Sequence, residues 1–366
     1  MKFETKKDKI IGAVQSADRT TAKNTSLPIL ECILLEAEQS GVTIRSTNLD
    51  LGLEIKIPAK VEETGKVAIQ GKVFLAYLNN LSDGDMLSAH LKDGILHVSS
   101  QRAKARIKSV PLDDFPIIPK VKDGHEGILD AGEMVLGLKS VAFACGAQSM
   151  KPELASVYVY SDGSELVCAT TDSFRLAEKR ISTNKRIPAL SVLIPYRNVL
   201  EIIRFLEQEK GDVSVVYNQN QITFESKTSF ISSRVVDGVF PDYKQIIPKE
   251  SKTKALVLKK DLMHALKTTV VFSDKFSMVS FILNMNDKKL TLTTKNNDVG
   301  ESEYEVEVSG EGSDISLNFN QRYVSDCFGS INTESLSLEF NGPGKPLLIR
   351  GAGDKSFLYV VMPMNK

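Results

Sequence analysis

The stretch TTDSFRLAEKR (residues 170–180) indicates that the chain is built from repeats, because two other parts of the chain resemble it. STNLDLGLEIK (residues 46–56) lies earlier in the chain and TTKNNDVGESE (residues 293–303) lies later. In each stretch, small polar residues typical of turns separate two arms that predict strands. Three similar strand–turn–strand segments in one chain indicate an internal repeat with a long period.

A fixed spacing supports the repeat. Lys72, Arg197 and Arg322 follow one another at intervals of 125 residues, and each lies near the start of a segment with helical periodicity. Three sets of apolar residues keep the same interval: Phe74, Val199 and Val324; Leu78, Ile203 and Phe328; Leu81, Leu206 and Ile331. Offsets of 4 and 3 within each segment place these apolar residues on one helix face.

A second set of positions repeats independently. Val110, Val235 and Val360 are again 125 residues apart, and each closes an apolar segment that predicts a strand: ARIKSV, ISSRVV and SFLYVV. Each repeat is expected to open with a helix, at residues 6–17, 131–146 and 259–272, and to continue as strands, a second helix and further strands. This order predicts an α+β fold in which each repeat is a sheet layer with two helices on one face. Three unrelated α+β domains remain the alternative.

The repeat also predicts domain limits. We expect domains at residues 1–120, 127–246 and 247–366, because Pro-, Gly- and Lys-rich segments at residues 115–127 and 240–254 lie at matching places. Like domains joined in series present complementary free edges at the two ends of the chain. Such a heterologous interface closes into a ring or grows into a filament. A closed head-to-tail homo-oligomer, with helices lining the inner face, removes the exposed strand edges.

Composition excludes several classes. The 46 Lys and Arg balance the 46 Asp and Glu, which argues against a protein that holds nucleic acid by phosphate neutralisation alone. The four cysteines form no CxxC pair, which predicts buried thiols in a reducing compartment rather than disulfides or zinc. The sequence lacks a secretory h-region and any apolar run near the roughly 20 residues of a membrane span. We therefore expect a cytoplasmic protein with no membrane partner.

Catalytic motifs are missing from the sequence. It has no GxSxG elbow, and GAGDKS (residues 351–356) lacks the spacing of a P-loop. The four histidines show neither HExxH nor another metal-ligand spacing. We therefore expect no catalytic residues, no metal and no cofactor, and the chain is not predicted to be an enzyme.

Four segments resemble one family. NTSLPILECILLE (residues 24–36), TTDSFRLAEKR, VDGVFPDYKQIIP (residues 236–248) and the terminal YVVMPM (residues 359–364) are similar to the bacterial DNA polymerase III beta subunit, or beta sliding clamp, and the resemblance covers the whole chain. It implies a head-to-tail homodimer whose six domains encircle double-stranded DNA and slide without sequence specificity. Such a processivity factor in DNA replication is opened by a clamp-loader ATPase and tethers DNA polymerases and repair proteins through a short linear peptide.

The zero net charge is compatible with this resemblance, because a ring holds DNA by topology and needs no strong phosphate contacts. It implies a DNA-facing set: Lys23, Asn24, Lys72, Lys139, Arg197, Arg204, Lys267 and Arg322. For each of these residues the alternative is an ordinary solvated helix face. At the dimer seam, an edge strand at residues 103–110 is expected to meet residues 268–276, with four candidates: Ala105, Ile107, Val271 and Phe272.

The C-terminal tail predicts a partner site. Pro363 cannot donate to a sheet, so pairing should stop near it, and flexible methionines on both sides suit a surface that accepts several partners. A frayed tail with core methionines is the alternative from the residues alone. The resemblance implies an apolar peptide groove between domains 2 and 3: Leu154, Thr171, Arg175, Leu176, Pro241, Ile246, Asn320, Tyr323, Val360, Met362, Pro363 and Met364.

Two functions stay open from the sequence. One is a DNA-encircling tether without catalytic activity. The other is an interaction scaffold built from the same repeats, with no DNA inside.

Overall fold

The protein forms two compact units, each with its own antiparallel sheet. A computed structural model describes residues 1–23, 26–112, 114–118, 120, 121, 123–183, 185, 189–248 and 250–364. Unit 1 consists mainly of Met1–Gly132 and Leu200–Val235, and unit 2 of Glu133–Asn184, Ala189–Val199 and Val236–Lys366. These units follow compactness and not the repeat, so the predicted domain limits stay a prediction.

Within the described residues, the sheet of unit 1 has 13 strands in the order β10-β15-β16-β17-β4-β3-β2-β6-β9-β8-β7-β1-β5. Their bounds are β1 (Lys2–Lys6), β2 (Cys32–Glu38), β3 (Gly41–Thr47), β4 (Leu51–Ile57), β5 (Lys60–Glu63), β6 (Gly65–Gln70), β7 (Met86–Lys92), β8 (Ile95–Ser99), β9 (Lys104–Val110), β10 (His125–Asp130), β15 (Asp212–Tyr217), β16 (Gln221–Glu225) and β17 (Ser229–Arg234).

The sheet of unit 2, again for the part of the chain that is described, has 12 strands in the order β14-β11-β12-β13-β25-β24-β23-β18-β21-β20-β19-β22. Their bounds are β11 (Ser156–Asp162), β12 (Glu165–Thr171), β13 (Arg175–Ser182), β14 (Ser191–Pro195), β18 (Thr253–Leu258), β19 (Met278–Asn284), β20 (Lys289–Asn296), β21 (Gly300–Glu311), β22 (Ile315–Asn320), β23 (Ser335–Phe340), β24 (Leu347–Gly351) and β25 (Phe357–Val361).

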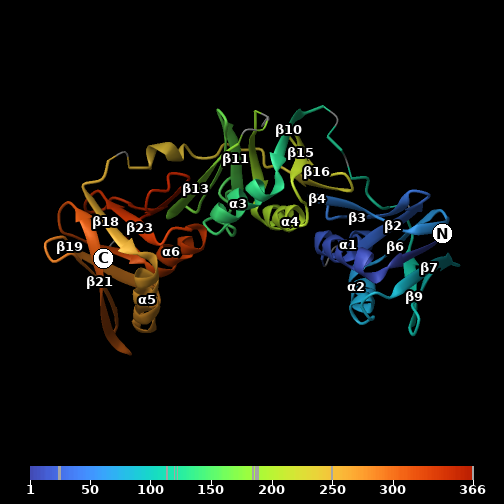
Figure 1. The fold of residues 1–366 in the computed structure, drawn as a ribbon, viewed down its shortest axis with the longest axis horizontal. Coiled ribbons are helices and arrows are strands. Elements are labelled where there is room, and N and C mark those ends of the chain that lie inside the picture. The colour runs from blue at the N-terminus through green and yellow to red at the C-terminus, as the bar shows by residue number, and fades with distance from the viewer. Residues whose placement is uncertain are drawn as a thin grey trace. The chain divides into compact units, whose positions relative to one another are not determined.

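The order of elements repeats three times along the chain (Figure 1). Each repeat runs strand, helix, four or five strands, helix and three strands. The six helices of the described chain are α1 (Lys7–Thr20), α2 (Gly71–Asn79), α3 (Ala131–Ala142), α4 (Tyr196–Leu206), α5 (Lys259–Thr269) and α6 (Gln321–Asp326). The predicted α+β class is therefore confirmed. The expectation that each repeat opens with a helix is wrong, because β1, β10 and β18 come first and their short, mixed polar segments gave no clear strand signal.

The 125-residue spacing reflects real equivalence. Lys72, Arg197 and Arg322 are each the second residue of their helix, in α2, α4 and α6. The nine apolar residues of the three helical segments that keep this spacing are all buried. The three stretches that first indicated the repeat are the ends of strand pairs: β3–β4, β12–β13 and β20–β21.

Two of these turns are built alike, atom for atom. The hydroxyls of Thr47 and Thr171 each donate to the carbonyl oxygen four residues later, over 2.9 and 2.7 Å. The Oδ1 atoms of Asn48 and Asp172 each accept the backbone N–H groups two and three residues later. The next residue has a positive φ in both turns, 76° and 77°. Short polar side chains that satisfy the local backbone thus fix the turn that the sequence repeats.

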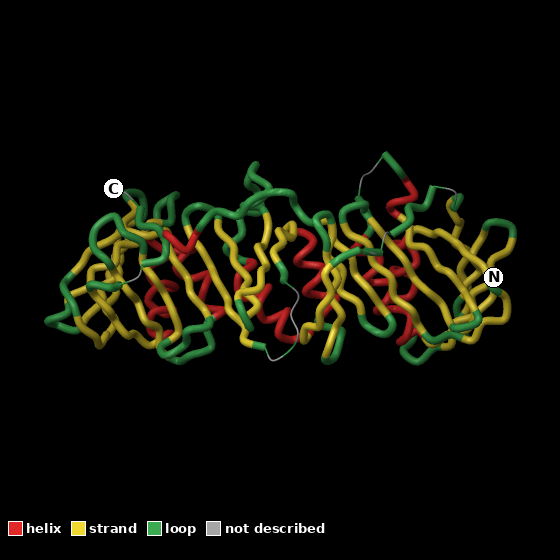
Figure 2. Tube along the Cα trace, turned by 90° about the horizontal axis from the view of Figure 1, so that it is seen from above, coloured by secondary structure: helices red, strands yellow, loops and turns green. Residues whose placement is uncertain are grey.

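The helices lie on one face of each sheet (Figure 2). In unit 1, α1 packs beside α2 and against β3 and β4, and in unit 2, α5 packs beside α6 and against β20 and β21. Helix α1 buries Ile10, Val14 and Ala17, which recur every three or four residues. None of the helices within the described residues is long and apolar enough to span a membrane.

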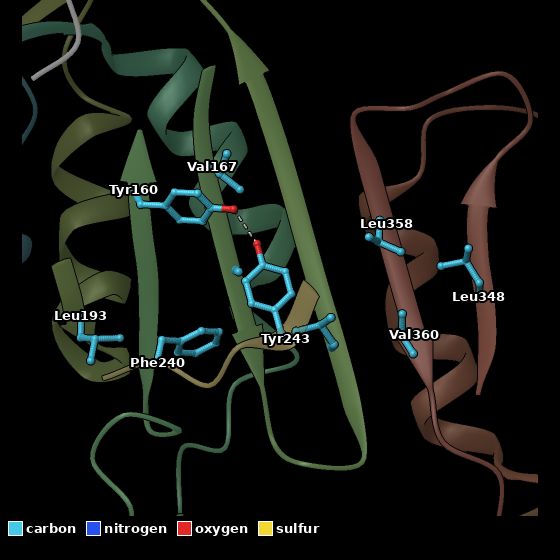
Figure 3. Packing of buried hydrophobic residues seen from close by; sticks show 10 residues of the cluster. Tyr160, Val167, Leu193, Phe240, Tyr243, Leu348, Leu358 and Val360 are labelled. Atoms are coloured by element: carbon cyan, nitrogen blue, oxygen red, sulfur yellow. Dashed lines mark hydrogen bonds between the residues drawn. The ribbon is translucent and has the colours of Figure 1, made fainter. Parts of the chain in front are cut away.

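An aromatic cluster in unit 2 fixes the segment that joins β17 to β18. Phe240 and Tyr243 from this segment pack with Tyr160, Leu358 and Val360 of β11 and β25. Figure 3 shows the two rings in front of the strands, with helices behind them. Tyr243 donates its hydroxyl to a carboxylate oxygen of Glu178 and lies 2.8 Å from the Tyr160 hydroxyl. Burial, followed by the nearby Glu178 charge, raises the pKa of Tyr243 well above its ordinary value.

We predict that Tyr243→Phe lowers the free energy of unfolding by about 1–3 kcal/mol, because Glu178 would lose a buried donor. The control is Tyr158→Phe in the same cluster, since the Tyr158 hydroxyl contacts Ser191 at an exposed position, 3.2 Å away. We expect a change below about 0.5 kcal/mol there. Urea denaturation of both variants measures the difference, and equal effects would contradict this role for Tyr243.

Candidate functional site

The C-terminal tail is held against the sheet of unit 2 after β25 ends at Val361. The backbone N–H of Met362 donates to the Phe174 carbonyl over 2.8 Å, and that of Met364 donates to the Asn318 carbonyl over 2.7 Å. The side chains of Met362, Pro363 and Met364 are half-buried. The described tail is therefore neither frayed nor part of the core.

Buried residues lie beneath this tail. Leu176 and Val360 are directly opposite one another where β13 pairs with β25, and both belong to the aromatic cluster of unit 2. Leu154 is also buried, and its carbonyl accepts the Gly146 N–H over 3.0 Å. The Thr171 hydroxyl is used inside the β12–β13 turn. These four predicted residues are buried and offer little open surface.

Arg175 is an internal strut. Its guanidinium donates to Asp172 Oδ2 and to the Phe143 carbonyl, both over 2.9 Å, and to Asp326 Oδ2 over 2.5 Å. Its Cζ atom lies 4.4 Å from the centre of the Tyr323 ring, within cation–π range. Burial alone would lower the Arg175 pKa, but Tyr359, Asp326 and Asp172 together outweigh it and raise the pKa above its ordinary value. Arg175 thus ties the β12–β13 turn to α6.

Asn320 and Tyr323 are positioned by the start of α6. Asn320 Oδ1 caps the helix by accepting the N–H groups of Arg322 and Tyr323, over 3.0 and 3.3 Å. Asn320 Nδ2 donates to the Phe276 carbonyl over 3.2 Å. The Phe276 side chain is 58% exposed beside these groups. From the sequence, residues 268–276 were predicted to lie at the dimer seam. Phe276 was not predicted as a groove residue, because the sequence does not show whether a Phe side chain is exposed.

Pro241 and Ile246 lie exposed on the segment that joins β17 to β18. Tyr243 connects them, because its N–H donates to the Pro241 carbonyl over 2.7 Å and its carbonyl accepts the Ile246 N–H over 3.0 Å. The Tyr243 ring packs in the cluster that contains Leu176 and Val360. Hydrogen bonds, strand pairing and packing thus connect several of the predicted groove residues within unit 2. Phe174, which is 60% exposed, adds an apolar surface beside Met362.

The predicted DNA-facing residues are exposed wherever the structure describes them. Six lie on helices: Lys72 on α2, Lys139 on α3, Arg197 and Arg204 on α4, Lys267 on α5, and Arg322 on α6. Lys23 lies in the loop after α1, and Asn24 lies outside the described residues. Arg204 forms an ion pair with Glu201, which also accepts Arg19 over 3.3 Å. The charge of Arg204 is therefore partly neutralised within the chain.

The predicted edge strand is free along most of its length. β9 pairs with β8 at residues 104–108 and with β6 only at Ser109 and Val110, so no second strand of the described chain pairs with residues 104–108. Within this strand Ala105 is half-buried and Ile107 is buried in the single chain. At the predicted partner region Val271 is exposed and Phe272 is half-buried.

A second free edge lies in unit 2. β21 pairs with β20 along Gly300–Glu307, whereas its pairing with β18 begins only at Val308. The sequence did not predict β21 as a seam candidate, because its alternating glutamates at positions 301, 303, 305 and 307 resemble an ordinary solvated strand.

Reactive groups are few in the described part of the chain. The four cysteines are free and buried, as predicted, and burial raises the pKa of Cys145 and of Cys168 to about 12. Thiols with such pKa values are poor nucleophiles at neutral pH. Among the residues that the structure describes, no cluster of three or more His, Cys, Asp or Glu could hold a metal ion.

Models of one protein family match the chain in three consecutive segments. They are described as the N-terminal, central and C-terminal domains of the DNA polymerase III beta subunit, and they match residues 1–119, 129–242 and 244–365. The beta sliding clamp of Synechocystis is 26% identical over an alignment of 390 residues that covers 100% of this chain and 99% of the relative. That of Bacillus subtilis is 23% identical over 378 residues and covers 100% of both.

Solved structures share the fold. The DNA polymerase III beta subunit from Thermotoga maritima has a TM-score of 0.94 and 26% identity, and it covers 100% of this chain and 99% of its own. A sliding clamp from Pseudomonas aeruginosa bound to griselimycin has a TM-score of 0.95 and 23% identity over 100% of both chains. These matches agree with the resemblance seen in the sequence.

Proposed function

Because the chain belongs to the DNA polymerase III beta subunit family, we propose that two copies close head to tail into a ring around double-stranded DNA. The chain is a sliding clamp of this family, a processivity factor of DNA replication and not an enzyme. The ring, its partners and a cytoplasmic location belong to the proposal. The observation that carries it is a pair of free strand edges with opposite charge.

The two edges fit one another chemically. On β9, Lys104, Arg106 and Lys108 are exposed at alternating positions, and on β21 the glutamates at 301, 303, 305 and 307 alternate in the same way. Alternating residues point to one face of a strand, so pairing β9 of one copy with β21 of the other would place opposite charges side by side. Each copy carries one edge of each kind, so two copies form two identical seams and leave neither edge free.

Exposed cations on the helices suit contact with DNA. Lys72, Arg197 and Arg322 occupy equivalent positions at the second residue of α2, α4 and α6. A ring that carries these helices on its inner face would present a regularly repeated positive charge to the phosphates. Because the ring holds DNA by topology, a few screened contacts suffice, and a net charge of zero is no obstacle.

The tail and its surroundings suit an apolar peptide. Met362, Met364, Phe174, Phe276 and Ile246 offer flexible or aromatic apolar surface around the base of Leu176 and Val360. Contiguous exposed apolar surface of this kind marks interaction sites, and methionine adapts to several partners. We assign to this groove the short linear peptides of DNA polymerases, repair proteins and the clamp-loader ATPase.

The first prediction separates a ring from a scaffold. After loading onto nicked circular DNA by the clamp-loader ATPase, the protein should co-elute with DNA in gel filtration and dissociate once the circle is linearised. A topological link is lost through free ends, whereas a bound scaffold would not respond to them. Retention on linear DNA equal to that on circles would contradict encirclement.

The second prediction tests the seam by exchanging charge. The triple variant Lys104→Glu, Arg106→Glu and Lys108→Glu should weaken the homodimer at least about 100-fold, since like charges would face one another at both seams. The variant Glu303→Lys, Glu305→Lys and Glu307→Lys should behave in the same way. Sedimentation velocity at micromolar concentration measures both.

A mixture of the two variants is the control for misfolding. In a mixed dimer both seams again join opposite charges, so the dimer should return. Two folded variants that stay monomeric in the mixture would refute the pairing of β9 with β21.

The third prediction concerns the tail. Met362→Ala with Met364→Ala should weaken binding of a fluorescent peptide from the C-terminus of a DNA polymerase at least about tenfold, because apolar contacts are lost while the backbone hydrogen bonds of the tail stay. Deleting residues 362–366 should abolish binding and leave the dimer intact. Met86→Ala is the matched control, since the Met86 side chain is 46% exposed on β7, in unit 1. Normal peptide binding by the truncated protein would exclude the assignment.

A further inference from the structure

Unit 1 contains a cavity that sliding does not require. Its volume is about 460 Å³, and it lies between the sheet and the segment that follows β9. Its walls include Leu34, Arg45, Glu54, Phe115, Ile118 and Phe230. The volume is in the range of pockets that bind small molecules, and the walls combine apolar side chains with a few charged groups.

The cavity has a counterpart elsewhere in the chain. In unit 1, β4 pairs with β17 and places Glu54 directly opposite Phe230. In unit 2, β13 pairs with β25 and places Glu178 directly opposite Leu358. In both units a carboxylate thus stands beside a large apolar side chain where strands of two successive repeats meet.

In unit 2 this place is filled by aromatic side chains. The Tyr243 hydroxyl donates to Glu178, and the Phe240 ring lies 5.0 Å from that of Tyr158 (Figure 3). The joining segment supplies both Phe240 and Tyr243. A phenol therefore occupies the space beside the carboxylate.

In unit 1 the joining segment supplies no phenol at the matching position. Phe115 matches Phe240 at the interval of 125 residues, but Ile118 stands where Tyr243 would be. Ile118 lies over the sheet at Gly52, since a Cβ atom added to Gly52 would meet Ile118 Cγ2 at 2.4 Å. Among the described residues that line the cavity, only Arg45 donates a hydrogen bond to Glu54, from Nε over 2.6 Å. The space beside this carboxylate is the cavity.

The charges of the walls favour a donor over an anion. Arg45 pairs with both Glu54 and Glu36, and Lys66 pairs with Glu36 over 2.6 Å. Lys120, which also lines the cavity, pairs with Glu225 over 3.3 Å. Each of these three cations thus already has a carboxylate partner. A carboxylate retains acceptor lone pairs beyond those one guanidinium uses, so Glu54 can accept a further hydrogen bond.

We propose that this cavity binds one small aromatic molecule that carries a hydrogen-bond donor, of the phenol or indole type. The ring packs against Leu34 and Phe115, beside the Phe230 ring whose centre lies 4.5 Å from Lys120 Nζ, and its hydroxyl or N–H donates to Glu54. The ligand takes the place that the Tyr243 ring fills in unit 2.

The test uses the full chain and three probes: p-cresol, toluene and benzoate. Ligand-observed NMR gives the affinities, and the methyl signals of Leu34 locate the binding. We expect p-cresol to shift the Leu34 methyl signals and to bind about tenfold more tightly than toluene, the value of one hydrogen bond to a charged group. Toluene binding as tightly as p-cresol, benzoate binding more tightly than p-cresol, or unmoved Leu34 signals would each overturn the proposal.

Two variants complete the experiment. Ile118→Tyr supplies the missing phenol and should abolish p-cresol binding while raising the melting temperature. Glu54→Met keeps the length of the side chain but removes both acceptor oxygens, and it should reduce p-cresol to the affinity of toluene without changing toluene itself. This second variant decides the case should Ile118→Tyr fail to fold. Unchanged p-cresol affinity in Glu54→Met contradicts the role of Glu54.

Discussion

Strand pairing between successive repeats holds the repeats together and determines which strand edges stay unpaired. β4 pairs with β17, and β13 pairs with β25, so strands from different repeats join one ladder without interruption. Paired strands leave no exposed edge between β4 and β17 or between β13 and β25. By contrast, no described strand pairs with one side of residues 104–108 in β9 or of Gly300–Glu307 in β21. The proposed self-association would cover both of these edges.

The two junctions share a backbone plan but differ in what covers them. In unit 2, Tyr243 and Phe240 seal the junction, and a buried hydroxyl satisfies Glu178. That packing also holds the segment that carries Pro241 and Ile246, because the Tyr243 backbone forms hydrogen bonds with both. In unit 1 the covering side chains differ, with Ile118 at the position of Tyr243 and Phe230 where unit 2 has Leu358, and a cavity remains. The side chains that cover each junction thus decide whether the chain fills it or leaves room for a ligand.

Periodic features were predictable from the sequence, and features that depend on packing were not. The interval joining Lys72, Arg197 and Arg322 located three equivalent helix starts, because buried apolar residues must keep the helical repeat in every copy. The strands β1, β10 and β18 were missed, since five or six mixed residues carry too little pattern. Arg175 was predicted to belong to the peptide groove, but its bond to Asp326 was not predictable, because Asp326 lies 151 residues away and no local sequence feature indicates the pair.

Charge is organised by position and not by total. The zero net charge hides a basic β9 edge, an acidic β21 and exposed cations at equivalent helix starts. Within one Debye length, about 8 Å at physiological salt, a seam or a phosphate senses only its neighbours and not the sum over the chain. Association through the edges and weak contact with DNA can therefore be tuned independently. Strong attraction for nucleic acid over the whole surface would slow sliding, and strong repulsion between copies would open the seam; balanced composition with local segregation avoids both.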